Sequence, residues 1–237
     1  MDHKFDSFKS AASGVTEALI NRLTAGVGTA WARLGSDWRP RVASLAEAEA
    51  LITRLRDQYN RGVDAEALLA RWRHAPSNFV VFGPRGREPE AGYIFYVLRD
   101  TAVAAMHAEG HLPRDAELDT FLFPDPQTLH GRGDAPAAFY LSFMWCRGGR
   151  RKRALVLSCF LTDLLRIHGP GSPWLYTRPT TEAALRMTHR RGFLDVDHGG
   201  PPASFRLVRS RLTLAETTVA PALIHPAVRD TLNDPPR

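Results

Sequence analysis

The spacing of apolar residues changes along the chain from helical to extended and back, which divides the sequence into distinct segments. Over residues 1–36, apolar side chains such as Phe5, Leu19 and Trp31 recur at three- and four-residue steps and therefore share one face of a glycine-interrupted helix. We expect an N-terminal helical arm that packs on its own domain or on a partner subunit.

A short strand and two helices are predicted next. Residues 37–43 have the pattern of a strand, and Ser44 followed three residues later by Glu47 is a capping box that starts a helix. A second helix is expected over residues 63–72, beginning at Asp64. One apolar stripe of the first helix consists of Leu45, Ala48, Leu51, Ile52 and Leu55.

The pattern then becomes extended. Residues 78–82 and 91–98 are rich in β-branched and aromatic side chains, and the glycines and prolines between them predict a hairpin. Residues 100–135 follow no sustained period, so we expect an insertion with one short helix over residues 101–109.

In the second half of the domain, the residue pattern predicts in order a strand, a basic loop, a helix, a strand, a helix and two more strands. Their expected bounds are residues 137–145, 147–153, 154–167, 174–177, 180–191, 194–196 and 204–208. We assign residues 37–210 to one domain and residues 211–237 to a C-terminal tail.

Composition narrows the class of protein. The chain has 237 residues, of which 44% are hydrophobic and 24% charged, as in a folded globular protein. It contains no apolar run of about 18 residues, which excludes a transmembrane helix, and its first residues do not resemble a secretory signal. Two cysteines make no disulfide framework, and no Cys/His spacing suits zinc. We therefore expect a cytoplasmic protein without a metal.

Charge favours an anionic ligand. The 31 basic and 25 acidic residues give a net charge of +6, and only Lys4, Lys9 and Lys152 are lysines. The planar guanidinium group of arginine binds phosphate and carboxylate through two parallel hydrogen bonds. The excess of arginine therefore directs attention to the places where arginines cluster.

The densest cluster lies between a predicted strand and a predicted helix. Gly148 and Gly149 allow unusual backbone geometry there, and a helix N-terminus adds unpaired N–H groups and a partial positive charge. The sequence matches neither the Walker pattern nor the dinucleotide-binding glycine pattern. It predicts a phosphate site, and the alternative is a solvated turn. The cations are Arg147, Arg150, Arg151, Lys152 and Arg153.

Two stretches resemble the GNAT family of N-acetyltransferases. Residues 140–145 (YLSFMW) with the arginine loop and Ala154-Leu155 are similar to the acetyl-CoA pyrophosphate segment, and residues 180–193 to a later helix ending in Gly-Phe. The resemblance covers residues 37–208. It implies an α/β (α+β) fold with a central mixed, mostly antiparallel sheet flanked by helices. It also implies that acetyl-CoA or another acyl-CoA binds between the splayed strands 139–145 and 174–177.

The resemblance has two departures. The family loop usually reads R/Q-x-x-G-x-G/A, and from Arg147 onward its glycine positions hold Arg150 and Lys152. These side chains either obstruct a pyrophosphate or replace part of its backbone cradle. In addition, the tyrosine that many members place four residues before the Gly-Phe glycine is replaced by Thr188.

The resemblance implies direct transfer to an amine of a small molecule or protein. Backbone N–H groups near Phe143, Met144 and Trp145 would polarise the thioester carbonyl. For proton transfer the candidates are Tyr140, Ser142 and His189. The alternatives are that Tyr140 is a core aromatic residue and that His189 lies on the surface.

Strand alternation puts Tyr140 and Ser142 on one face of their strand and Phe139, Leu141 and Phe143 on the other. Cys146 precedes the five cations, which would favour its thiolate, but no His or Asp can be assigned as its partner.

Two other functions stay open. One is an N-acyl amino-acid or autoinducer-type synthase that takes its acyl chain from acyl carrier protein, an acidic partner suited to a basic surface. The other is a non-catalytic module that binds nucleic acid or an acidic protein through residues 147–153. We rank this last, because nucleic-acid surfaces spread basic and aromatic residues over a whole face.

Overall fold

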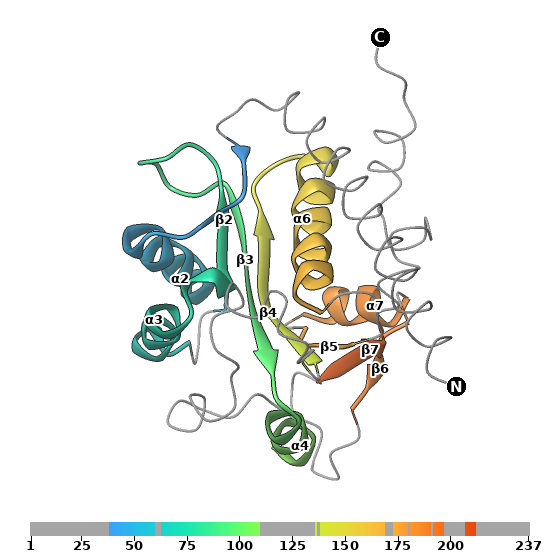
Figure 1. Ribbon diagram of the computed structural model, residues 1–237. Coiled ribbons are helices and arrows are strands. Elements are labelled where there is room, and N and C mark those ends of the chain that lie inside the picture. The colour runs from blue at the N-terminus through green and yellow to red at the C-terminus, as the bar shows by residue number, and fades with distance from the viewer. Residues whose placement is uncertain are drawn as a thin grey trace, which may run out of the picture.

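The computed structural model describes residues 38–59, 63–109, 136, 138–168, 173–179, 181–190, 192–196 and 207–211 (Figure 1). The expected N-terminal arm and most of the insertion after residue 109 lie outside these ranges, as does the expected C-terminal tail except Arg211, which ends the last strand. Within them, no helix is long and apolar enough to cross a membrane.

A seven-stranded sheet forms the centre of the domain, in the order β1-β2-β3-β4-β5-β7-β6. Neighbouring strands are antiparallel except β4 and β5, which run parallel. The predicted central mixed, mostly antiparallel sheet is therefore confirmed. The strands are β1 Arg41–Val42, β2 Phe79–Phe82, β3 Ala91–Leu98, β4 Ala138–Cys146, β5 Trp174–Thr177, β6 Leu194–Asp195 and β7 Val208–Arg211.

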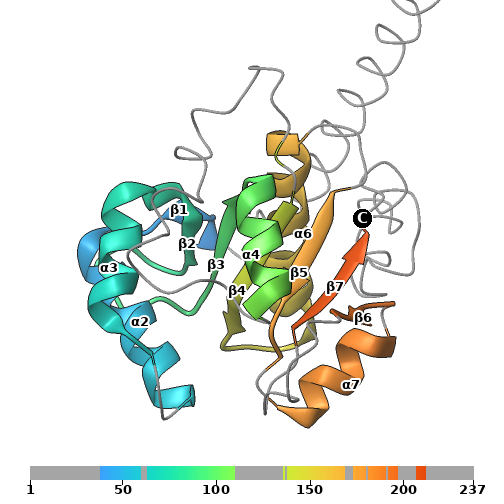
Figure 2. The same ribbon diagram turned by 90° about the horizontal axis from the view of Figure 1, so that it is seen from below.

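Helices cover both faces of the sheet (Figures 1 and 2). One face carries α2 (Leu45–Tyr59), α3 (Ala65–His74) and α4 (Asp100–Glu109). The other carries α6 (Arg150–His168), while α7 (Glu182–Arg190) lies beside β6 at one end of the sheet. A short 3-10 helix, η2 (Pro76–Asn78), leads into β2.

Two hydrophobic cores result, one on each face. On the α2 face, Leu51 and Met106 pack with Tyr96, Tyr140 and Tyr176 of the central strands. The α6 face is aromatic: the Phe160 ring lies 5.4 Å from the Tyr93 ring and 5.9 Å from the Phe95 ring. The Tyr93 hydroxyl donates to Asp163 Oδ2 of α6 at 2.5 Å. The long α6 is thereby fixed against β3.

The predicted helix caps at Ser44 and Asp64 are confirmed. Ser44 N donates to Glu47 Oε2 at 3.0 Å and Glu47 N to Ser44 Oγ at 3.4 Å, which completes the capping box. Asp64 Oδ1 accepts from Ala67 N at 3.0 Å at the start of α3. The predicted stripe of α2 is buried from Ala48 to Leu55, whereas Leu45 in the first turn is 44% exposed.

Several predicted bounds are corrected. The strand expected over residues 37–43 is only Arg41–Val42, because these two residues alone pair with β2, opposite Val81 and Val80. The last strand is shifted to Val208–Arg211, where it inserts between β5 and β6. The loop expected over residues 147–153 is three residues long, since α6 begins at Arg150. Arginine and lysine both have high helix propensity, so the cations extend the helix.

Gly92, in the middle of β3, is required by close packing. A Cβ at this position would lie 2.8 Å from the Val80 carbonyl oxygen and 3.1 Å from Leu51 Cδ1 of α2. We predict that Gly92→Ala lowers the free energy of unfolding by about 1–3 kcal/mol, the usual cost of overpacking a core. Urea denaturation measures this change. Leu51→Ala in the Gly92→Ala background should recover none of it, because the backbone contact stays; full recovery would contradict this reason.

Candidate functional site

The candidate site begins where β4 leaves β5. The parallel pairing runs from Ala138 and Trp174 to Leu141 and Thr177, while β4 continues to Cys146. Beyond Leu141, the edge of β4 that faces β5 pairs with no strand in the part of the chain that the structure describes. The Thr177 hydroxyl donates to the Leu141 carbonyl at 3.0 Å and so closes the ladder.

A β-bulge marks the same point. Leu141 pairs with Phe95 and Phe143 with Ile94, which leaves Ser142 as the extra residue of β4. The bulge reverses the expected alternation, so Phe143 shares the α2 face with Tyr140, and Met144 shares the α6 face with Leu141. The predicted grouping of Phe143 with Phe139 was therefore wrong, because one inserted residue shifts a period of two.

The glycine loop connects β4 to the N-terminus of α6. Arg147 N donates to the Glu90 carbonyl at 2.7 Å, which fixes the start of the loop on β3. Arg153 N, bonded to the Gly149 carbonyl at 3.2 Å, is the first amide of α6 with a partner one turn back. By helix geometry the amides of the preceding turn lack such partners, and with the helix dipole they favour an anion.

The ammonium group of Lys152 points to Glu90 at the end of the β2–β3 turn. Its Nζ donates to Glu90 Oε2 at 2.6 Å and lies 4.7 Å from the centre of the Trp38 ring. Trp38 Nε1 donates to the same oxygen at 2.9 Å. The stem of Lys152 passes over Gly148, where a Cβ would lie 2.7 Å from Lys152 Cδ. The ammonium group of Lys152 therefore points to Glu90, while its stem covers Gly148.

Gly149 is open and the loop is cationic. No described residue lies within 4 Å of a Cβ at Gly149. The side chains of Arg147 and Arg153 are exposed, and Arg153 Nε donates to the Gly148 carbonyl at 3.1 Å. An open backbone, a helix N-terminus and exposed arginines together fit a diphosphate.

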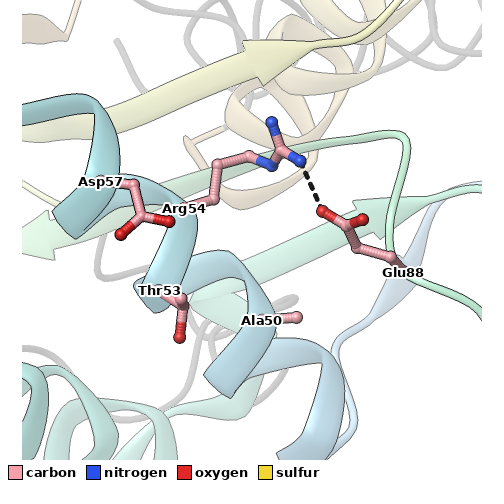
Figure 3. Close-up of a pocket in the computed structure, with 5 residues that line it drawn as sticks. All are labelled: Ala50, Thr53, Arg54, Asp57 and Glu88. Carbon is pink, nitrogen blue, oxygen red and sulfur yellow. Dashed lines mark hydrogen bonds and ion pairs between the residues drawn. The ribbon is translucent and has the colours of Figure 1, made fainter.

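A surface pocket of about 560 Å³ lies beside the last residues of β4, between α2 and the β2–β3 turn (Figure 3). Arg54 bridges its two sides, donating to Glu88 Oε1 at 2.5 Å and lying 4.1 Å from the centre of the Trp145 ring. Arg54 is the main cause that holds the pKa of Glu88 below its usual value, so Glu88 is ionised. The pocket is lined by Ala50, Thr53, Arg54, Asp57 and Glu88.

Tyr140 is buried and stacks on Tyr96 with 6.5 Å between the ring centres. Burial raises the pKa of Tyr140 to about 12. At neutral pH the phenol therefore keeps its proton and can donate it but cannot act as a base. This position fits the alternative of a core aromatic residue.

His189 and Thr188 have other contacts. His189 Nε2 lies 2.9 Å from Asp195 Oδ1 of β6, and both side chains are 40% exposed. The Thr188 hydroxyl donates to the Leu185 carbonyl at 2.8 Å. No hydrogen bond or ion pair between described residues joins His189 to Tyr140 or Ser142.

Cys146 is half-buried at the end of β4. Burial raises the pKa of its thiol, outweighing the cations Arg153 and Lys152. The basic sequence context alone suggested a thiolate, but desolvation decides the opposite sign. Cys146 is therefore protonated at neutral pH, which does not favour a covalent acyl intermediate.

Sequence reasoning missed a cluster of His107, Tyr176 and Arg209 under α4. His107 Nε2 lies 2.7 Å from the Tyr176 hydroxyl and 3.3 Å from Arg209 Nη1. Because arginine only donates, His107 Nε2 accepts and its proton is on Nδ1. Burial and then Arg209 lower the pKa of His107. The strand pairing of β5 with β7 places Tyr176 opposite Arg209. A correct register would therefore have predicted this pair from the sequence, but not the contact with His107. No group of three or more His, Cys, Asp or Glu side chains that could hold a metal ion occurs among the described residues.

No family model matches the sequence, and no curated protein matches it. Two solved structures are similar. A GNAT-family acetyltransferase from Listeria monocytogenes is 14% identical, with a TM-score of 0.41 over 74% of this chain and 95% of that one. An N-acetyltransferase from Staphylococcus aureus is 14% identical, with a TM-score of 0.40 over 73% and 100%. Neither similarity identifies a donor, an acceptor or a site residue of this chain.

The contact of Lys152 with Glu90 predicts slow acylation of this amine. Glu90→Gln removes the charged acceptor, so an amine-acylating reagent should modify Lys152 several-fold faster in this variant. Peptide mass spectrometry follows the reaction, with Lys4 and Lys9 as internal references. Glu88→Gln is the matched control and should leave the rate unchanged. Equal rates in all three proteins would show that Lys152 is free of Glu90.

The lowered pKa of His107 predicts a loss of stability in acid. The native state holds His107 neutral, whereas the unfolded chain protonates it below about pH 6.5, so stability falls as pH decreases through that value. We expect His107→Gln to flatten the fall in Tm between about pH 7.5 and pH 5.5. His74→Gln, at an exposed residue of α3, is the control. The same slope in wild type and His107→Gln would contradict this assignment.

Proposed function

We propose that the protein is an N-acyltransferase that moves an acetyl or longer acyl group from acyl-CoA to an amine by direct attack. One observation carries the proposal: β4 parts from β5 after Leu141 and Thr177 and then leads directly into the glycine loop and the N-terminus of α6. The open edge of β4, where a thioester arm would bind, is therefore continuous with the loop where a diphosphate would bind.

The diphosphate would bind at the start of α6. The amides of its first turn supply hydrogen bonds, and Gly149, where no described residue fills the space of a Cβ, lets the ligand approach the backbone. Guanidinium groups add charge-assisted bonds, and those of Arg147 and Arg153 are exposed. The proposed cations are Arg147, Arg150, Arg151 and Arg153. Lys152 is not among them, because its ammonium group binds Glu90.

The pantetheine arm would lie along the open edge of β4. Residues 142–146 have no partner strand on this side among the described residues, so their backbone groups are available to the amides of the arm. Amides near Phe143, Met144 and Trp145 would then polarise the thioester carbonyl. Ser142, at the bulge, would lie nearest to the reacting carbon because the strands part there.

The reaction needs one proton removed and one supplied. The neutral amine attacks the thioester carbon, the C–N bond forms, and the C–S bond breaks to release the thiolate of coenzyme A. The ammonium proton leaves to a base or to water, and a donor protonates the thiolate. Tyr140, Ser142 and His189 stay the candidates for these steps, although burial raises the pKa of Tyr140 to about 12 and so makes its phenol a poor proton donor to the thiolate.

The pocket beside Trp145 is the proposed place of the amine. Two carboxylates, Asp57 and Glu88, line it. Glu88 is ionised and already paired with Arg54, and Asp57 forms no ion pair with another described residue. A cationic acceptor therefore fits the pocket better than an anionic one.

A thermal titration tests the function. At a concentration of one hundred times its Kd, coenzyme A should stabilise the protein by about 2.7 kcal/mol, which raises Tm by about 5–10 °C for a domain of this size. Pantetheine, which lacks the diphosphate, should give a much smaller shift. The Arg147→Ala/Arg150→Ala variant should lose most of the coenzyme A shift.

Arg73→Ala, at an exposed residue of α3, is the matched control and should keep the full shift. If millimolar coenzyme A leaves Tm unchanged, or if pantetheine shifts it equally, the proposed donor site is wrong.

A further inference from the structure

Exposed arginines gather at the end of the sheet where the candidate diphosphate site lies. Arg39 precedes β1, Arg85 and Arg87 belong to the β2–β3 turn, and Arg147 and Arg153 flank the start of α6. Figure 1 shows the β2–β3 turn, β1 and the β4–α6 loop together at the top of the molecule. We call these five arginines the arginine end.

The acidic residues at this end are already paired with other cations. Glu47 binds Arg41, Glu88 binds Arg54 at 2.5 Å, and Glu90 binds Lys152 at 2.6 Å. Of the arginine end, only Arg147 approaches a described carboxylate, Glu88, at 3.9 Å. The positive charge of the arginine end is therefore not neutralised within the described part of the domain.

The arginine end covers a wider surface than the binding of a coenzyme A diphosphate requires. The loop and the α6 N-terminus already supply amides, Arg147 and Arg153 for a diphosphate. Arg39, Arg85 and Arg87 come from segments far from this loop in sequence and add a field over a wider surface. Such a field guides an oppositely charged macromolecule to the mouth of the site.

Apolar side chains at this end favour a protein over a nucleic acid. Val42 and Leu45 are exposed at 38% and 44%, next to Arg41, whose Nη1 donates to the Gly83 carbonyl of the β2–β3 turn. Protein interfaces combine apolar contact with a charged rim. Single-stranded nucleic acids stack on exposed aromatic rings, and the exposed large hydrophobic residues of the described chain include none.

We propose that the arginine end docks an acidic acyl carrier protein, whose phosphopantetheine arm delivers the acyl thioester to the gap between β4 and β5. This inference rests on the proposed acyl transfer and names the partner that supplies the donor. The same bonds form and break as with acyl-CoA, and the leaving thiolate is that of the carrier's phosphopantetheine.

Charge reversal at the β2–β3 turn tests the partner. The test uses the full chain with an acyl carrier protein and with acyl-CoA carrying the same acyl group. In Arg85→Glu/Arg87→Glu we expect kcat/KM with the carrier protein to fall about ten-fold or more, because rim charges steer association, and kcat/KM with acyl-CoA to change little. Arg73→Glu/Arg186→Glu, at exposed residues of α3 and α7, has the same net charge and should behave as wild type.

Calorimetry with the holo carrier protein gives a readout independent of turnover. Binding that weakens in Arg85→Glu/Arg87→Glu and with added salt supports the docking surface even if no acceptor has been found. Turnover with acyl-CoA but no binding of the carrier protein overturns this inference and leaves the proposed function intact. Tight, salt-sensitive binding of RNA that the carrier protein does not displace also overturns it.

Discussion

Pairing between β4 and β5 stops at Leu141 and Thr177, although β4 continues to Cys146. Among the described strands, only β3 pairs with the second half of β4, and the bulge at Ser142 turns its side chains relative to the first half. Because the strand then enters α6 through a three-residue loop, the open edge and the helix N-terminus form one continuous surface. Every proposed contact with the donor depends on this geometry.

The paired carboxylates organise the surface around this opening. Glu90 joins Trp38 and Lys152 and, through its carbonyl, the amide of Arg147, so it fixes both ends of the glycine loop. Glu88 likewise holds Arg54 over Trp145. Glu90 thus fixes Lys152, and Glu88 fixes Arg54. The exposed arginines of the arginine end can then bind the anionic groups of a ligand or partner.

The α2 face carries a row of polar aromatic residues across the sheet. Register places Tyr96, Tyr140, Tyr176 and Arg209 opposite one another on β3, β4, β5 and β7. Burial keeps Tyr140 protonated, whereas burial and Arg209 keep His107 neutral. A protonated phenol and a neutral imidazole therefore lie on the same face, near the point where β4 and β5 part.

Periodicity and caps determined the local structure: the helix start at Ser44 and Glu47, the hairpin over residues 78–98 and the strand before the arginine cluster follow from the sequence alone. The glycines and cations of the loop could also be identified there. The tertiary structure alone decided that Lys152 turns to Glu90, that Phe143 changes face and that the thiol of Cys146 stays protonated. These depend on strand register, on burial and on partners distant in sequence, which no local pattern encodes.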